Sequence, residues 1–302
     1  MGRVTGSTDT ALVNYQGTGG LTGVSFNNGF NIGKKFYVGL QATYLFGAVT
    51  NESLIQLFSN VPGKFSGAYP INYQQRTNYS GFALKPGFAY RDTLSKNLLL
   101  TVGGTYGVPT QLNARRLNRL IPITALGTES ESEILEGVDT VGTESKGKVT
   151  APAAYRLGVT VDRPFHWALS ADVAYRQWSG FRNFGASTDL KNTLSLSLGG
   201  EWTPNINSIS NYLSRTTYRA GLQYGQMPIS SGGKQLRDVS VSAGVFFPIT
   251  PPDRRTLSYL NVAFTAGQRG TLDNNQIRER YVRMTLAFTL NDFGWFIPRR
   301  IE

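Results

Sequence analysis

The chain has 302 residues, of which 40% are hydrophobic and 12% aromatic, with 34 glycines, no cysteine and a formal net charge of +11 at pH 7. This length suits one large all-β domain, and the absence of any apolar run near ~18 residues excludes a helical membrane protein. The lack of cysteine excludes disulfides, thiolate metal sites and a cysteine nucleophile.

The N-terminal stretch MGRVTGSTDTALVNYQ contains one early arginine but lacks the apolar core of ~7–15 residues that a signal peptide carries. For a protein that reaches an outer membrane, we therefore expect the translated precursor to begin upstream of Met1.

Alternation of apolar and polar residues, which predicts β-strands, recurs along the whole chain. It is weak near residue 9 and regular from residue 36, and it is most pronounced in DLKNTLSLSLGGEW. There Leu194, Leu196 and Leu198 fall on one face, and Ser195 and Ser197 on the other. About twelve strands are predicted, at residues 9–16, 20–31, 36–47, 78–91, 97–108, 153–162, 166–178, 189–202, 215–225, 237–249, 257–268 and 281–292.

The connections alternate between short and long. The tight turns include IGKK, DTLSK and DRPF, whereas residues 48–77 and 110–148 are predicted as long loops; residues 203–214, of middling length, break the contrast. Short turns on one side and long loops on the other are typical of outer-membrane β-barrels. We therefore predict one antiparallel transmembrane β-barrel domain over residues 1–302, with short periplasmic turns and long extracellular loops.

All four tryptophans lie at predicted strand ends, where an aromatic girdle would meet lipid headgroups. Tryptophan also packs at sheet ends in any β protein, so this observation alone leaves both interpretations open. The residues are Trp167, Trp178, Trp202 and Trp295.

The polar face of the predicted strands is basic. A lysine or arginine at the bilayer midplane costs ~2–4 kcal/mol on the lipid side, so these side chains must line water or one another. Either they form ion pairs inside a filled lumen, or they create a field that favours anionic solutes such as carboxylates. The lumen-lining candidates are Lys85, Arg156, Asp172, Arg176, Lys191, Glu201, Arg219 and Arg283.

Residues 125–147 form the acidic run of the chain. We expect a solvated external loop. The alternative is a divalent-cation bridge to lipopolysaccharide phosphates or to a partner, since hard cations prefer carboxylate oxygens. Glu129, Glu131 and Glu133 are the weak metal candidates for such a bridge.

The other motifs in the sequence give little support for a catalytic, metal-binding or nucleic-acid-binding function. The single histidine, His166, is placed at a predicted periplasmic turn, which argues against a zinc site or a Ser-His-Asp hydrolase. The segments GTGG and SSGGK match no phosphate-binding loop. No contiguous basic patch with interleaved aromatics is present, so we expect no nucleic acid partner. We expect neither catalysis nor a cofactor.

Several blocks together resemble the outer-membrane transport protein family of long-chain fatty acid and aromatic hydrocarbon channels, in the form common in Bacteroidetes. They are GTGGLTGVSFNNGFNIGKKFYVGLQATYLFG, GEWTPN, YRAGLQY, GQRGTLDNN and LNDFGWFIPRR. The resemblance implies a barrel that usually has fourteen strands, an N-terminal hatch, and hydrophobic solutes that leave sideways through the wall. The hatch and about two first strands have no counterpart in this chain, so we expect an N-terminally incomplete record or a smaller barrel.

The resemblance leads us to expect passive uptake of small hydrophobic or amphipathic molecules, such as fatty acids, across the bacterial outer membrane. The expected partners are the lipid bilayer, lipopolysaccharide and hydrophobic or anionic amphipathic solutes. Two alternatives remain: a non-transporting structural subunit of a larger complex with other outer-membrane proteins, and a soluble β-sandwich or lectin-like domain.

Overall fold

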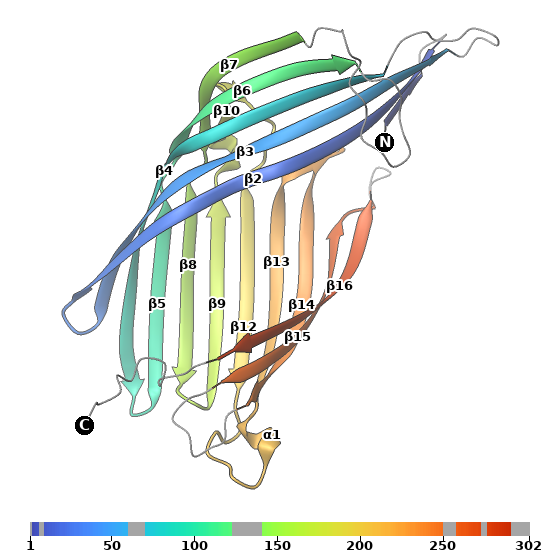
Figure 1. Cartoon of the computed structure of the whole chain (residues 1–302). Helices are drawn as coiled ribbons and strands as arrows, with labels where there is room; N and C mark the ends of the chain where they lie inside the picture. Colours follow the sequence, from blue (N-terminus) through green and yellow to red (C-terminus); the bar gives the residue numbers. More distant parts are fainter. Residues whose placement is uncertain are drawn as a thin grey trace, which may run out of the picture.

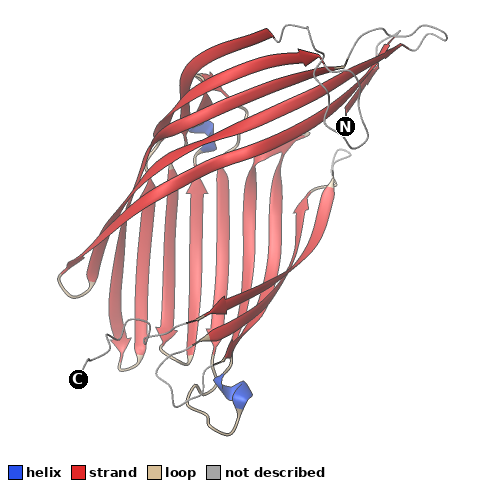
Figure 2. Ribbon diagram, in the orientation of Figure 1, coloured by secondary structure: helices blue, strands red, loops and turns tan. Residues whose placement is uncertain are grey.

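The computed structural model describes residues 2–5, 9–59, 70–122, 141–249, 258–272 and 277–290. These residues form one large, curved antiparallel sheet (Figures 1 and 2). Among them, no helix is long and apolar enough to cross a bilayer.

The strands follow one another along the sheet in nearly sequential order. Each pairs antiparallel with its neighbour. The strands are β1 (Gly2–Thr5), β2 (Asp9–Ile32), β3 (Phe36–Ser59), β4 (Ile71–Ser95), β5 (Leu98–Gly107), β6 (Thr110–Pro122), β7 (Val141–Ala151), β8 (Ala154–Arg163), β9 (Trp167–Arg176), β10 (Arg182–Asn183), β11 (Ala186–Ser187), β12 (Thr193–Trp202), β13 (Thr217–Ser231), β14 (Lys234–Pro248), β15 (Tyr259–Gly270) and β16 (Arg278–Thr289).

Two of the long strands are interrupted: β5 and β6 are two parts of one strand, and so are β7 and β8. β4 pairs with β5 near the periplasmic turn and with β6 farther up, and β7 and β8 pair with β6 and β5 in the same way. The breaks fall at Pro109 and Pro152, since proline has no amide hydrogen for the ladder. The long strands around the sheet are therefore β2, β3, β4, β5–β6, β7–β8, β9, β12, β13, β14, β15 and β16, close to the predicted twelve.

One predicted boundary was wrong. The segments 9–16 and 20–31 are one strand, β2. The glycines between them hide the alternation, and Gly19 has φ +93°. Gly19 lies opposite Val49, and Gly47, with φ +147°, lies opposite Leu21. A Cβ at Gly19 would clash with the carbonyl oxygen of Ala48, so a close backbone approach requires glycine here.

In Figure 1, β6, β7 and the upper halves of β2, β3 and β4 run at an angle to the other strands of the sheet. Gly47 lies opposite Tyr79 of β4, close to the position where β4 changes its partner from β5 to β6 across the break at Pro109. We call the upper halves of β2, β3 and β4, together with the whole of β6 and β7, the extension.

The extension contains residues that were predicted as loop. β3 continues to Ser59 and β4 begins at Ile71, so much of 48–77 is strand, and β6 and β7 take up much of 110–148. Likewise, β13 and β14 join at the short turn Gly232–Gly233, within a segment predicted as a long loop. These stretches carry polar residues on both faces and apolar residues at irregular spacing, so hydrophobic alternation does not mark them as strand. The short turns after β2, β4 and β8 agree with the prediction.

The apolar face of the lower strands has nothing packed on it. Leu196 and Leu198 are 43% and 57% exposed, and Leu222, Phe264 and Leu286 are exposed in the same way. A soluble sandwich would bury these side chains against a second sheet, and the described residues form one sheet only. This outward apolar face is the surface that lipid would cover.

A small conventional core is present in the extension. Leu112, Ala114, Val149 and Ala153 are the buried hydrophobic residues of the described chain. Beside them, β10 pairs with β7, and the ring of Phe184 lies 4.0 Å below the guanidinium of Arg116. Gly147 leaves the space for this ring, because a Cβ there would clash with it.

Aromatic residues gather at the periplasmic ends of the strands. Trp167 and Trp202 are directly opposite each other on β9 and β12, and the ring of Tyr218 lies 5.9 Å from that of Trp202. Trp178 is in the short 3-10 helix η1 (Trp178–Gly180) beyond β9, and Trp295 is outside the described residues. A short helix, α1 (Tyr212–Arg215), follows β12 at the periplasmic end.

Candidate functional site

The inner face of the sheet, opposite the apolar face, is lined by small residues. Register places glycines of neighbouring strands close together on it, so that the backbone itself forms much of the wall. We call the following set the glycine wall: Gly39, Gly87, Gly103, Gly158, Gly199, Gly221, Gly244 and Gly267. Glycine on a strand marks close approach of a ligand or of another backbone.

Two adjoining hollows lie along this wall, with volumes of about 680 Å³ and about 620 Å³. Thr160 borders both. The larger hollow lies against β8, β9 and β12–β15, and the smaller against β2–β5, β8 and β9. Each is wide enough for a small organic molecule, since ligand sites commonly measure ~300–1,000 Å³.

Two of the predicted lumen-lining residues form an ion pair beside the smaller hollow. Arg156 Nε of β8 donates to Asp172 Oδ1 of β9 at 3.1 Å, and both side chains border this hollow. Both remain partly exposed, so this is a wet cross-strand ion pair. Such pairs hold side chains in place and contribute little net free energy.

Two further predicted lumen-lining residues form an ion pair at the larger hollow. Arg219 Nη2 lies 2.8 Å from Glu201 Oε2, and the same guanidinium lies 3.6 Å from the ring centroid of Phe246. Asn261 also borders this hollow, and its buried Oδ1 has no hydrogen-bond partner within the described chain. The hollow therefore offers an aromatic surface, a cation and a free acceptor side by side.

The remaining basic candidates have no ion pair with another residue that the structure describes. Within the described ranges, no carboxylate lies in ion-pair distance of Lys85, Arg176 or Arg283. Lys85 lies opposite Gln41 and Arg283 opposite Thr265 on the inner face. Asp172 and Glu201 are each paired with an arginine, so Lys85, Arg176 and Arg283 add positive charge to the inner face beyond these two pairs.

Lys191 was placed on a strand by the sequence pattern, but β12 begins only at Thr193. Its backbone nitrogen donates to the carbonyl of Pro228, which fixes it in the connection beyond the upper end of β12. The apolar alternation of 189–202 therefore begins later than predicted.

One inner cluster was missed by sequence reasoning. Arg269 Nε donates to Asp238 Oδ2 at 2.9 Å, and the Tyr281 hydroxyl donates to Asp238 Oδ1 at 2.8 Å. Asp238 lies at the start of the predicted strand 237–249, but it was not among the predicted lumen-lining residues. The sequence does carry a signal, because Asp238 falls on the same face of the strand as Ser240 and Ser242, two and four residues farther along.

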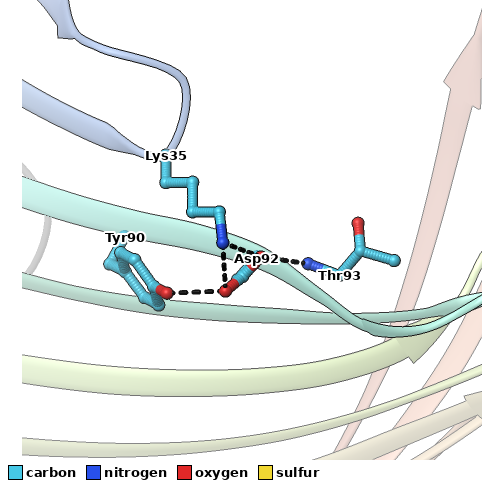
Figure 3. A network of polar contacts seen from close by, with 4 residues as sticks. All are labelled: Lys35, Tyr90, Asp92 and Thr93. Atoms are coloured by element: carbon cyan, nitrogen blue, oxygen red, sulfur yellow. Dashed lines mark hydrogen bonds and ion pairs between the residues drawn. The ribbon is translucent and has the colours of Figure 1, made fainter.

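The periplasmic rim contains a second polar network, shown in Figure 3. Lys35, in the turn after β2, lies 2.8 Å from Asp92, and the Tyr90 hydroxyl donates to the same carboxylate at 2.7 Å. The backbone nitrogen of Thr93 donates to Asp92 Oδ1. The hydrogen bonds from Lys35, Tyr90 and Thr93 lower the pKa of Asp92 to about 2. The network ties the first periplasmic turn to β4.

The weak metal candidates Glu129, Glu131 and Glu133 lie outside the described residues. Of the acidic run, Glu144 is described. It accepts two hydrogen bonds from Arg115, at 2.8 and 2.7 Å, which lower the pKa of Glu144. Across the described ranges, no cluster of three or more His, Cys, Asp or Glu residues could hold a metal ion.

Comparison with solved structures places the fold. The chain is similar to a FadL homologue from Pseudomonas aeruginosa, with a TM-score of 0.53 and 12% identity over 93% of this chain and 73% of that one. It is also similar to the CymD monoaromatic hydrocarbon channel, with a TM-score of 0.41 and 11% identity over 94% of this chain and 88% of that one. No curated protein matches the sequence.

The fold and the two contrasting faces define an antiparallel β-barrel protein of the outer membrane. The family model of BamG matches residues 3–302. The chain therefore belongs to the BamG family.

Proposed function

We propose that the protein is a passive outer-membrane conduit for small hydrophobic or amphipathic molecules, such as fatty acids. The observation that carries the proposal is the pair of adjoining hollows on the glycine wall, bordered by fixed ion pairs and with uncompensated lysine and arginine on the same inner face. The resemblance of several sequence blocks to fatty acid channels agrees with it.

Each part of the inner face would have a role in passage. Small side chains leave room for an apolar tail to slide along the backbone, because no large group has to move. Positive charge on the inner face raises the local concentration of anionic headgroups. Phe246 and Arg219 would contact the tail and the headgroup, respectively, near the periplasmic end. The proposed lumen residues are the eight predicted ones other than Lys191, and no step depends on a hatch segment.

Uptake into proteoliposomes tests the proposal. Gly199 has room for a side chain, since the nearest atom to an added Cβ is the Ala220 carbonyl oxygen at 3.9 Å. We expect Gly199→Trp, which fills the larger hollow, to lower oleate uptake several-fold. Ala220→Trp adds the same group on the lipid side and is the matched control, with uptake unchanged. Wild-type uptake equal to that of empty liposomes would reject the conduit.

Charge selectivity gives a second test. Glu201→Gln frees the Arg219 guanidinium, so uptake of an anionic amphiphile should rise relative to its neutral alcohol analogue. Arg219→Gln should shift the ratio the other way. An unchanged ratio in both variants would remove this pair from the pathway.

A second candidate function is a non-transporting structural subunit of a larger outer-membrane complex. The ion pairs Arg156–Asp172 and Arg219–Glu201 favour it, because paired side chains on the inner face can fill a lumen. Purification with other membrane proteins in a fixed ratio, without flux in liposomes, would support this candidate.

A further inference from the structure

The outer face of the extension is basic. On β4, Phe82 points outward and is 70% exposed, and β4 pairs with β3 without a bulge in this region, so Arg76 and Asn78 lie on the same face as Phe82. Register then places Arg115 of β6 opposite Asn78, and Lys146 of β7 opposite Arg115. We call the exposed cations of this face on β4, β6 and β7 the basic patch: Arg76, Arg115, Arg119, Lys146 and Lys148.

The opposite face of the same strands is covered by protein. Leu112 and Val149 are buried there, and the ring of Phe184 lies against Gly147 and under the guanidinium of Arg116. The two faces of β6 and β7 therefore differ in kind. One packs on the small core of the extension, and the other presents the basic patch to the surroundings of the protein.

The basic patch has little compensating charge. Glu144 lies on the same face and accepts two hydrogen bonds from Arg115. In the part of the chain that the structure describes, no carboxylate lies within ion-pair distance of the other four cations. Arg115 and Lys146 are directly opposite each other, and like charges in this position destabilise a sheet. A bound anion would relieve this repulsion.

An aromatic cluster lies directly below the basic patch. The rings of Tyr44 and Phe82 are 4.9 Å apart, and those of Tyr44 and Phe46 are 5.9 Å apart. Such rings mark the interface between hydrocarbon and headgroups in outer-membrane barrels. On β4, the position level with Lys148 is about 7 Å above Phe82, and the position level with Arg115 is about 13 Å above it, at ~3.3 Å per residue. The basic patch therefore begins at the height of the headgroups on the extracellular side.

We propose that the basic patch binds the phosphate groups of lipopolysaccharide in the outer leaflet of the membrane. Charge complementarity and height favour this occupant, because its phosphates lie where the apolar wall ends and its acyl chains would contact that wall beside Phe82. Arginine can bind phosphate through two parallel hydrogen bonds, and lysine binds it as a point charge. The ligand would hold the extension against the membrane surface. This inference does not rest on the proposed conduit.

Titration of the purified full chain in detergent micelles with fluorescent lipopolysaccharide that lacks the O-polysaccharide tests the proposal. Fluorescence anisotropy measures the affinity. Lys146→Gln/Lys148→Gln removes two exposed cations of the basic patch, and we expect the affinity to fall several-fold. Lys34→Gln/Lys96→Gln, in exposed periplasmic turns, makes the same change in net charge and is the matched control, with the affinity unchanged. Gel mobility after heating checks that both variants fold as the wild type does. If the lysine variant does not fold, Arg119→Gln replaces it, with the same direction expected.

Three further arms identify the ligand chemistry. Lipopolysaccharide stripped of its phosphates keeps its acyl chains and sugars, and it should bind the wild type several-fold more weakly. Binding of the intact glycolipid should persist in EDTA, because the cations contact phosphate without a bridging metal. Inorganic phosphate at the concentration of the glycolipid should not compete.

Four results would overturn the proposal. They are equal affinity for the stripped glycolipid, loss of binding in EDTA, competition by inorganic phosphate, which would indicate a site for free anions, and unchanged affinity of the patch variant. The last result is also the one expected if an acidic polypeptide, rather than lipid, covers this face. Liposome flux does not enter this test, so it can fail while the conduit stands, and the reverse.

Discussion

The lower barrel wall and the extension are parts of one sheet that face different surroundings. In the wall, Leu198 and Phe264 are more than half exposed, whereas in the extension Leu112 and Val149 are buried. The same antiparallel ladder therefore holds its apolar residues in two ways. In the wall the bilayer is the apolar medium, and in the extension the protein must supply its own core. Substitutions of the same kind should accordingly have different effects in the two regions.

The largest effect is expected from the core of the extension. Leu112→Ala removes a side chain that is 5% exposed, and such changes cost about 2–5 kcal/mol. Hydrogen exchange in β6 and β7 should accelerate, whereas exchange in β12–β14 should stay the same. Leu120→Ala, on the same strand at 45% exposure, is the control and should have little effect. Equal effects of the two variants would contradict a buried core in the extension.

A charged substitution should destabilise the wall where it faces lipid and have little effect where it faces the lumen. Leu198→Arg places a cation against lipid and should destabilise the folded barrel by about 2–4 kcal/mol. Ser197→Arg, one residue away on the inner face, should cost much less, because that side is wet. Urea titration of refolding into bilayers measures both variants. Similar losses would contradict the assignment of the two faces.

The bend between wall and extension depends on backbone freedom. Gly47 has φ +147°, and a Cβ there would clash with the carbonyl oxygen of Gly20. Gly47→Ala should therefore destabilise the folded state by about 1–3 kcal/mol, seen as a lower unfolding temperature in a gel-mobility assay. Gly20→Ala is the control, since an added Cβ there meets no atom within 4 Å. A normal unfolding temperature for Gly47→Ala would show that the bend tolerates a side chain.

Much of the wall could be predicted from the sequence. Alternation at 189–202 and 281–292 reports burial on one face, and lipid and a protein core impose the same pattern. Parity alone predicted that Arg156, Asp172, Arg219 and Glu201 lie on one face, but which of them pair depends on the register between neighbouring strands, which the sequence did not predict. The extension was missed, since its strands carry polar residues on both faces and their apolar residues follow no regular alternation. Lys191 was misplaced because the alternation of 189–202 starts before β12 does, and the approach of Phe184 to Gly147 is a contact across strands that no local pattern contains.

The smallest expected effect concerns the rim network. The pKa of Asp92 is lowered to about 2, below its ordinary value near ~3.9. A depressed carboxyl pKa contributes stability above the ordinary pKa and loses it as the pH falls through the folded value. The first periplasmic turn should therefore loosen as the pH falls from about 4 to about 2, as measured by proteolysis with an acid-active protease. In Asp92→Asn this pH dependence should be absent. A wild-type turn whose cleavage is independent of pH in this range would contradict the network.

The central claim, that the apolar face meets lipid while the glycine wall encloses water, is tested most directly by cysteine scanning of β12. Since the chain has no native cysteine, single cysteines at each position from 193 to 202 can be labelled in the membrane with a water-soluble and a lipid-soluble maleimide. We predict a period of two: positions 194, 196, 198 and 200 react with the lipid-soluble reagent, and 195, 197, 199 and 201 with the water-soluble one. Labelling without this alternation, or protection of the leucine positions from both reagents, would contradict the account.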